Sequence, residues 1–124
     1  MARRRILIVD DEEGMLEVCA DCLSMIDAEI VTEVDSTRAM ERVLVERWDL
    51  LIADVRMPGM GGVELLRLAR DRDPTLAVLM ITAFPDVETA KQCRQLGAVG
   101  FLSKQVLAQE LLASARRVLE VRYA

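Results

Sequence analysis

Four short apolar segments of this sequence are each followed at once by side chains that can take part in chemistry. These side chains are Asp10 and Asp11 after the segment 6–9, Asp54 after 50–53, Thr82 after 76–81, and Ser103 with Lys104 after 99–102. Carboxylates held close together repel one another and raise each other's pKa unless a cation lies among them. Mg²⁺ is a hard cation that prefers such oxygen ligands. If the four segments end at one place, the sequence predicts a magnesium site there.

The chemistry that such a group of side chains supports is phosphoryl transfer to a carboxylate. An aspartate can act as the nucleophile and form an aspartyl phosphate. The metal bridges carboxylate and phosphoryl oxygens, a lysine ammonium holds another oxygen, and a hydroxyl can bond a third. Taken singly, each residue also has a structural explanation, since acids are favoured at the start of a helix by its dipole. Their shared position after apolar segments favours the functional explanation.

The apolar segments alternate with segments of helical spacing. Five of them are expected to be strands: 6–9, 29–34, 50–53, 76–81 and 99–102. Apolar runs without polar alternation are typical of parallel strands that are covered on both faces. The order βαβαβαβαβα predicts the doubly wound α/β class, with five parallel strands and helices on both faces. In that class, ligands bind beyond the carboxyl ends of the strands, which is where the polar side chains above are expected.

The helices are predicted from apolar residues three or four positions apart. Their expected inward residues are Met15, Leu16, Cys19, Cys22, Leu23 and Ile26; Met40, Val43 and Leu44; Val63, Leu65, Leu66 and Ala69; Val87, Ala90 and Leu96; and Leu107, Leu111, Ala115, Val118 and Leu119. Asp35 with Ser36 predicts the start of the second helix, and Gly97 the end of the fourth. Because the C-x-x-C pair Cys19 and Cys22 lies within the first apolar stripe, we expect it to pack in the core rather than bind zinc or undergo redox chemistry.

Composition excludes several functional classes. The 124 residues allow one domain. The 21 acidic against 16 basic side chains argue against direct binding of a nucleic-acid backbone, so Arg3–Arg5 is expected to be a solvated leader. The lack of histidine excludes Ser–His–Asp, Cys–His and HExxH zinc chemistry. No segment resembles a signal peptide or reaches the roughly 20 apolar residues that span a bilayer, so we expect a soluble, cytoplasmic protein with no membrane contact.

Four segments, in order, resemble the receiver domain of bacterial two-component response regulators. They are ILIVDDEEGM, LLIADVRMPGMGGVELL, VLMITAF and GFLSK. The resemblance extends from Arg5 to about Arg122, so residues 1–124 are expected to form a single receiver domain with its active core at about 5–122. It implies a flavodoxin-like (βα)5 fold with strand order 2-1-3-4-5. The segment DVRMPGM also resembles receivers that precede ATPase-type transcriptional activators.

The resemblance implies a phosphoacceptor and a metal site. Asp54 matches the aspartate that accepts a phosphoryl group from a sensor histidine kinase, in a reaction that depends on Mg²⁺. Asp10 and Asp11 match the acidic pair that organises the metal, Asp11 directly and Asp10 through water. The third protein ligand is implied to be the backbone carbonyl of Arg56. Since these 124 residues contain no histidine, the phosphodonor imidazole is expected to lie elsewhere, and a histidine kinase is the implied partner.

The resemblance also implies a conformational switch. Thr82 matches the hydroxyl that turns toward the phosphoryl group, Lys104 the lysine that neutralises it, and Phe101 the aromatic switch position. The signal is expected to reach the face formed by the fourth helix, the fifth strand and the fifth helix, through which a homodimer could form. Gln105 stands where the family usually has a proline after the lysine. A cis bond before Gln105 would cost about 2.5–4 kcal/mol, so we expect a trans bond there.

Two other functions compete with a phosphorylated switch. One is an interaction module that keeps the receiver fold but is not phosphorylated. The other is a phosphatase of the haloacid-dehalogenase type, whose D-x-D nucleophile motif is here Asp10-Asp11-Glu12 and so lacks its second aspartate. We expect no enzymatic turnover of an external substrate. The sequence leaves open whether a C-terminal effector domain follows this chain in the natural protein.

Overall fold

Five parallel strands form one sheet in the order β2-β1-β3-β4-β5. The computed structural model describes residues 3–123, with side chains described as far as Glu120; residues 1–2 and 124 of the expected domain lie outside the described residues. The strands are β1 (Arg4–Val9), β2 (Ala28–Glu33), β3 (Leu50–Asp54), β4 (Ala77–Thr82) and β5 (Gly100–Ser103). The helices are α1 (Glu13–Cys22), α2 (Ser36–Val45), α3 (Gly62–Arg72), α4 (Val87–Gln95), the 3-10 turn η1 (Lys104–Val106) and α5 (Leu107–Tyr123).

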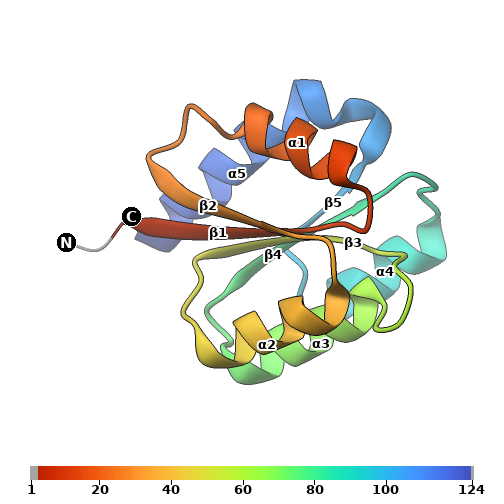
Figure 1. Ribbon diagram of the computed structural model, residues 1–124. Coiled ribbons are helices and arrows are strands. Elements are labelled where there is room, and N and C mark those ends of the chain that lie inside the picture. Colours follow the sequence, from red (N-terminus) through yellow and green to blue (C-terminus); the bar gives the residue numbers. More distant parts are fainter. Residues whose placement is uncertain (1–2, 124) are drawn as a thin grey trace.

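Helices cover both faces of the sheet, as Figure 1 shows: α1 and α5 lie on one face, and α2, α3 and α4 on the other. Every residue of β3 and β4 is buried, which explains why the central segments of the sequence are apolar without alternation. Side chains of β1 alternate between two cores, Leu7 and Val9 facing one and Ile6 and Ile8 the other. The predicted fold class and strand order are therefore confirmed.

The start of β1 corrects the expectation for the arginine run. Arg4 and Arg5 belong to the strand and pair in register with Ala28 and Glu29 of β2. The guanidinium of Arg5 lies 4.1 Å from the centre of the Trp48 ring. It also donates to Glu46 at 2.8 Å. A solvated leader was therefore the wrong expectation for Arg5, because cation–π and ionic partners distant in sequence hold its side chain.

The end of α1 differs from the prediction. Helix α1 ends at Cys22 rather than near Ile26, because the Leu23 amide donates to both Cys19 and Ala20 and tightens the last turn. Ile26 lies in the following turn and still packs against the core. Cys19 is fully buried, as core packing requires.

In α2 and α4, smaller residues occupy the inward positions. Leu44 is 38% exposed, while Ala39 and Val43, four positions apart, face the sheet. Val87 is 77% exposed because it is the first residue of α4, and the fully buried residue of that helix is Cys93. Of the predicted inward residues, Val43 is buried and Met40 and Leu96 pack against the core, so apolar type identified only part of the inward face of these two short helices.

The start of α3 packs directly against the end of β3, and this contact shapes the loop after Asp54. A Cβ atom at Gly62 would lie 1.8 Å from the carbonyl oxygen of Asp54, so no other residue fits there without a shift of the backbone. The Gly62 amide donates to the Val55 carbonyl at 3.0 Å.

Gly97 follows the last turn of α4 and has φ +102°, so it ends that helix as predicted. Among residues 3–123, no helix is both long and apolar enough to cross a membrane.

Candidate functional site

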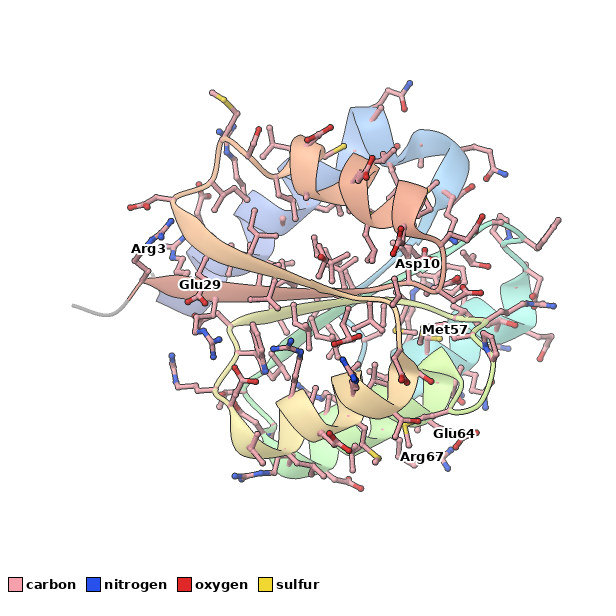
Figure 2. The ribbon with its side chains drawn as sticks, in the orientation of Figure 1. Arg3, Asp10, Glu29, Met57, Glu64 and Arg67 are labelled. Atoms are coloured by element: carbon pink, nitrogen blue, oxygen red, sulfur yellow. The ribbon has the colours of Figure 1, made fainter. Side chains whose placement is uncertain are left out.

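Asp10, Asp11 and Asp54 meet at the carboxyl end of the sheet. Asp10 follows β1 and Asp54 ends the neighbouring strand β3, where Val9 and Ala53 pair in register. One carboxylate oxygen from each of the three aspartates lies within 4.8 Å of the others. Asp10 and Asp54 are buried and Asp11 is exposed. In Figure 2, Asp10 and Met57 of the β3–α3 loop mark this end of the sheet.

Lys104 brings a positive charge between the two buried aspartates. Its Nζ lies 2.8 Å from Asp10 Oδ2 and 3.1 Å from Asp54 Oδ2, and its side chain is 7% exposed. Burial acts to lower the pKa of Lys104, but bonding to Asp10 and Asp54 outweighs it, so that the pKa lies above its ordinary value. The ammonium ion is therefore firmly charged and holds β1, β3 and the end of β5 together.

The bond between Lys104 and Gln105 is trans, as predicted, since the described residues contain no cis peptide. Lys104 begins η1, and the Ser103 side chain caps this turn by accepting a hydrogen bond from the Gln105 amide. The lysine side chain therefore reaches both aspartates without the proline that usually follows it in the family. Its third neighbour, Glu12 Oε1 at 3.4 Å, was not predicted, although Glu12 belongs to the acidic run after β1.

The two carboxylate oxygens of Asp10 have different partners. Its Oδ1 accepts from the Glu12 amide at 2.9 Å. Its buried Oδ2 pairs with the Lys104 ammonium at 2.8 Å. Burial raises the pKa of Asp10, although the Lys104 ammonium acts against this effect. Three carboxylates whose oxygens lie within 4.8 Å of one another fit the all-oxygen ligand set of Mg²⁺.

Asp54 is held from two sides. Its Oδ1 accepts from the Arg56 amide at 3.2 Å, and its Oδ2 accepts from Lys104 at 3.1 Å. The Arg56 side chain points elsewhere, because its guanidinium lies 3.7 Å from Asp86 at the start of α4. That ion pair was not predicted, and neither residue type nor spacing signals it. The carboxylate of Asp54 is thus oriented by backbone on one side and by a charged side chain on the other.

Thr82 and Phe101 lie next to this group but do not touch Asp54 in the hydrogen bonds described. Thr82 is 2% exposed and ends β4, the strand beside β3. Its hydroxyl oxygen accepts from the Phe84 amide at 3.2 Å. Phe101 lies half-buried in β5, pairs in register with Met80 of β4, and packs against the core cluster to which Cys93 of α4 also belongs. The structure therefore brings Asp10, Asp11, Asp54 and Lys104 together and leaves Thr82 and Phe101 at the side toward α4.

Comparison with known proteins agrees with this geometry. Residues 6–116 match the family model described as the response regulator receiver domain. The chain is 34% identical over 122 residues to the C4-dicarboxylate transport transcriptional regulatory protein DctD of Pseudomonas aeruginosa, covering 98% of this chain and 26% of that protein. It is 30% identical over 119 residues to the DNA-binding transcriptional regulator NtrC of Escherichia coli, covering 96% of this chain and 25% of NtrC. The chain thus spans about a quarter of the length of these relatives.

A solved structure is also similar along nearly the whole chain. It is the CheY-like response regulator receiver domain protein from Methanospirillum hungatei, with a TM-score of 0.91 and 25% sequence identity. The match covers 98% of each chain. The fold and the order of elements are therefore shared over the complete set of strands and helices.

Proposed function

Because the chain belongs to the family of response regulator receiver domains, we propose that it is a phosphorylation-dependent switch in which Asp54 accepts a phosphoryl group from a sensor histidine kinase. Receiver domains are signalling modules that work with histidine kinases and bind Mg²⁺ at an acidic pocket. The observation that carries the proposal is the position of Lys104, whose ammonium lies within 3.1 Å of an oxygen of both Asp10 and Asp54. A charge in this place can hold a phosphoryl oxygen once Asp54 has been modified.

The residues that would hold Mg²⁺ are Asp11, Asp54 and the backbone carbonyl of Arg56, with Asp10 acting through water. When bound, the ion supplies positive charge that offsets the carboxylates and the incoming phosphoryl oxygens. The cluster of three carboxylates supports this assignment. Asp10 remains beside Lys104 and keeps that ammonium next to Asp54.

In the transfer, a carboxylate oxygen of Asp54 attacks the phosphorus of phosphohistidine. The new O–P bond forms as the N–P bond breaks, and the electron pair of that bond returns to the imidazole nitrogen. The Arg56 amide and Lys104 hold the Asp54 carboxylate in place before the attack. Lys104 then bonds a phosphoryl oxygen, and the Thr82 hydroxyl donates to another.

The phosphoryl group adds a charge of about −1.5 to −2 next to an acidic cluster, and this change drives the switch. As Thr82 moves toward the new oxygens, Phe101 enters the space beside it, and the face of α4, β5 and α5 changes shape. The half-burial of Phe101 against the core beneath α4 supports this path. The same face is the proposed surface for a homodimer.

The effector that this receiver controls is inferred from the relatives. DctD and NtrC are transcriptional regulators that are about four times as long as the matched segment. We infer that this receiver controls an effector domain in the same polypeptide, as expected for receivers that precede ATPase-type activators. We propose no direct contact between this domain and nucleic acid.

Labelling with a small phosphodonor tests the function. The protein is incubated with acetyl phosphate or phosphoramidate, with and without Mg²⁺, and phosphorylation is detected by intact-protein mass spectrometry. We expect labelling that requires Mg²⁺, is lost in Asp54→Ala, and persists in Asp71→Ala, a matched change at an exposed aspartate of α3. A fully folded protein that takes no label would favour the unphosphorylated interaction module instead.

A further inference from the structure

Gln105 forms a side-chain bridge between two loops of the site. Its Nε2 donates to the backbone carbonyl of Ala83 at 3.1 Å, across from η1 to the loop between β4 and α4. Its Oε1 accepts from the Ser103 hydroxyl. Its backbone amide donates to the same hydroxyl oxygen at 3.3 Å. The amide group of Gln105 is thus bonded through both of its polar atoms, although its side chain lies at the surface.

The bridge attaches next to both residues that must act on a phosphoryl group. Ala83 directly follows Thr82, whose hydroxyl oxygen accepts from the Phe84 amide. Gln105 directly follows Lys104, which holds Asp54. The far end of the same loop is held by the ion pair of Arg56 and Asp86 at 3.7 Å. The β4–α4 loop, residues 83–86, therefore has a side-chain contact at each end.

We propose that Gln105 is a positioning residue that holds the β4–α4 loop in its resting place and opposes the movement of Thr82 toward a phosphoryl group. This inference rests on the proposed function of Asp54. A contact made in the resting state and broken in the phosphorylated state shifts the equilibrium toward rest by its own free energy. A proline at this position has no donor and could not form the contact. Gln105 thus sets how readily this receiver responds.

The size of the effect follows from the type of bond. A neutral hydrogen bond at an exposed site contributes at the lower end of the usual range for such bonds, which corresponds to about a two- to fivefold change in an equilibrium constant. Loss of the bond should therefore tighten the binding of a phosphoryl analogue by about two- to fivefold. A purely structural contact would have the opposite effect or none, since its loss would weaken the folded site.

The test compares Gln105→Met with Gln109→Met. Methionine keeps the length of the side chain without a charge or a hydrogen-bond donor, and Gln109 is an exposed glutamine on α5. Hydrogen exchange of the Ala83 and Phe84 amides is measured by NMR without Mg²⁺, and beryllofluoride is then titrated at constant Mg²⁺. We expect faster exchange and about two- to fivefold tighter beryllofluoride binding in Gln105→Met, with Gln109→Met like the unsubstituted protein.

Three results would overturn the inference, and the first can be told apart from the other two. If the unsubstituted protein binds no beryllofluoride, the proposed function of Asp54 fails and this inference fails with it. If the unsubstituted protein binds it and Gln105→Met binds it equally or more weakly, the proposed function stands and the role of Gln105 is refuted. Unchanged amide exchange in Gln105→Met would also refute that role.

Discussion

Replacing Lys104 with methionine should destabilise the folded protein and make its stability depend on Mg²⁺. The Lys104 side chain is 7% exposed, and its ammonium lies 2.8 Å from Asp10 and 3.1 Å from Asp54. Methionine fills a similar volume without the charge. The two buried carboxylates would then face each other and Asp11 with no cation among them.

The expected loss can be worked from the distances. Oxygens of the three aspartates lie within 4.8 Å of one another. Two unit charges at such a distance repel by about 3 kcal/mol at an effective dielectric constant of about 20. Removing one partner of a buried ion pair costs about 3–5 kcal/mol. We therefore expect Lys104→Met to lower the free energy of unfolding by about 3 kcal/mol in metal-free buffer. Because the carboxylates can bind Mg²⁺ only in the folded state, saturating Mg²⁺ should return much of this loss.

Urea unfolding followed by tryptophan fluorescence measures this directly. Trp48 is the only tryptophan of the chain and is 1% exposed, so unfolding changes its environment strongly. The matched control is Lys91→Met, at the other lysine of the chain, which is exposed on α4 and should shift the free energy of unfolding by less than about 0.5 kcal/mol. A loss below about 1 kcal/mol, or an equal loss with and without Mg²⁺, would refute the electrostatic role given to Lys104.

Three further predictions concern other parts of the site. Gly62→Ala should lower the free energy of unfolding by at least about 2 kcal/mol and weaken Mg²⁺ binding, because the added Cβ would clash with the Asp54 carbonyl. Gly14→Ala is the control, since its Cβ would lie in open space and the change should be neutral or stabilising. Urea unfolding and a Mg²⁺ titration measure the two effects. Phe84, two positions after Thr82, has no acid or amide group that could orient a water for hydrolysis of the aspartyl phosphate. Phosphorylated Asp54 should therefore persist for minutes or longer in Mg²⁺, and a lifetime of seconds measured by mass spectrometry would contradict this. The pKa of Asp86 is lowered, chiefly by the hydrogen bond from the backbone amide three residues later, so its charge adds stability above its unfolded pKa that is lost as pH falls through the lowered folded value. Thermal melts of Asp86→Asn, which keeps the cap without the titration, should therefore vary less between neutral and acidic pH.

The strands and the main chemical residues could be predicted from the sequence because each depends on a local pattern. Asp54 and Thr82 end segments that are apolar throughout, and a parallel sheet brings the ends of its strands to one edge. Lys104 was identified in the same way, and the structure confirms that it reaches the aspartates. The start of β1 escaped prediction because the partners of Arg5 lie on other elements, with Glu46 and Trp48 some forty residues away.

The bridge from Gln105 to Ala83 marks a different limit of prediction. The substitution of glutamine for proline was visible, but its consequence depended on where the amide could reach, and that distance is set by the packing of η1 against the β4–α4 loop. Cys93 is a similar case, because a short helix offers too few apolar residues to identify its buried face. Local patterns predict which residues end a strand, whereas contacts between loops depend on the assembled fold.

The division of the basic residues between arginine and lysine follows the same logic as the site. Fourteen of the sixteen are arginines, and two of them hold acids distant from the reactive group, since Arg5 pairs with Glu46 and Arg42 with Glu33. A planar guanidinium suits such fixed pairs, since its donors match one carboxylate geometry. In the proposed function, the charge of Lys104 contacts Asp10 and Asp54 at rest and a phosphoryl oxygen after transfer. A compact ammonium with rotatable donors can change partners in this way without moving the backbone, which explains why a chain so rich in arginine carries lysine at this position.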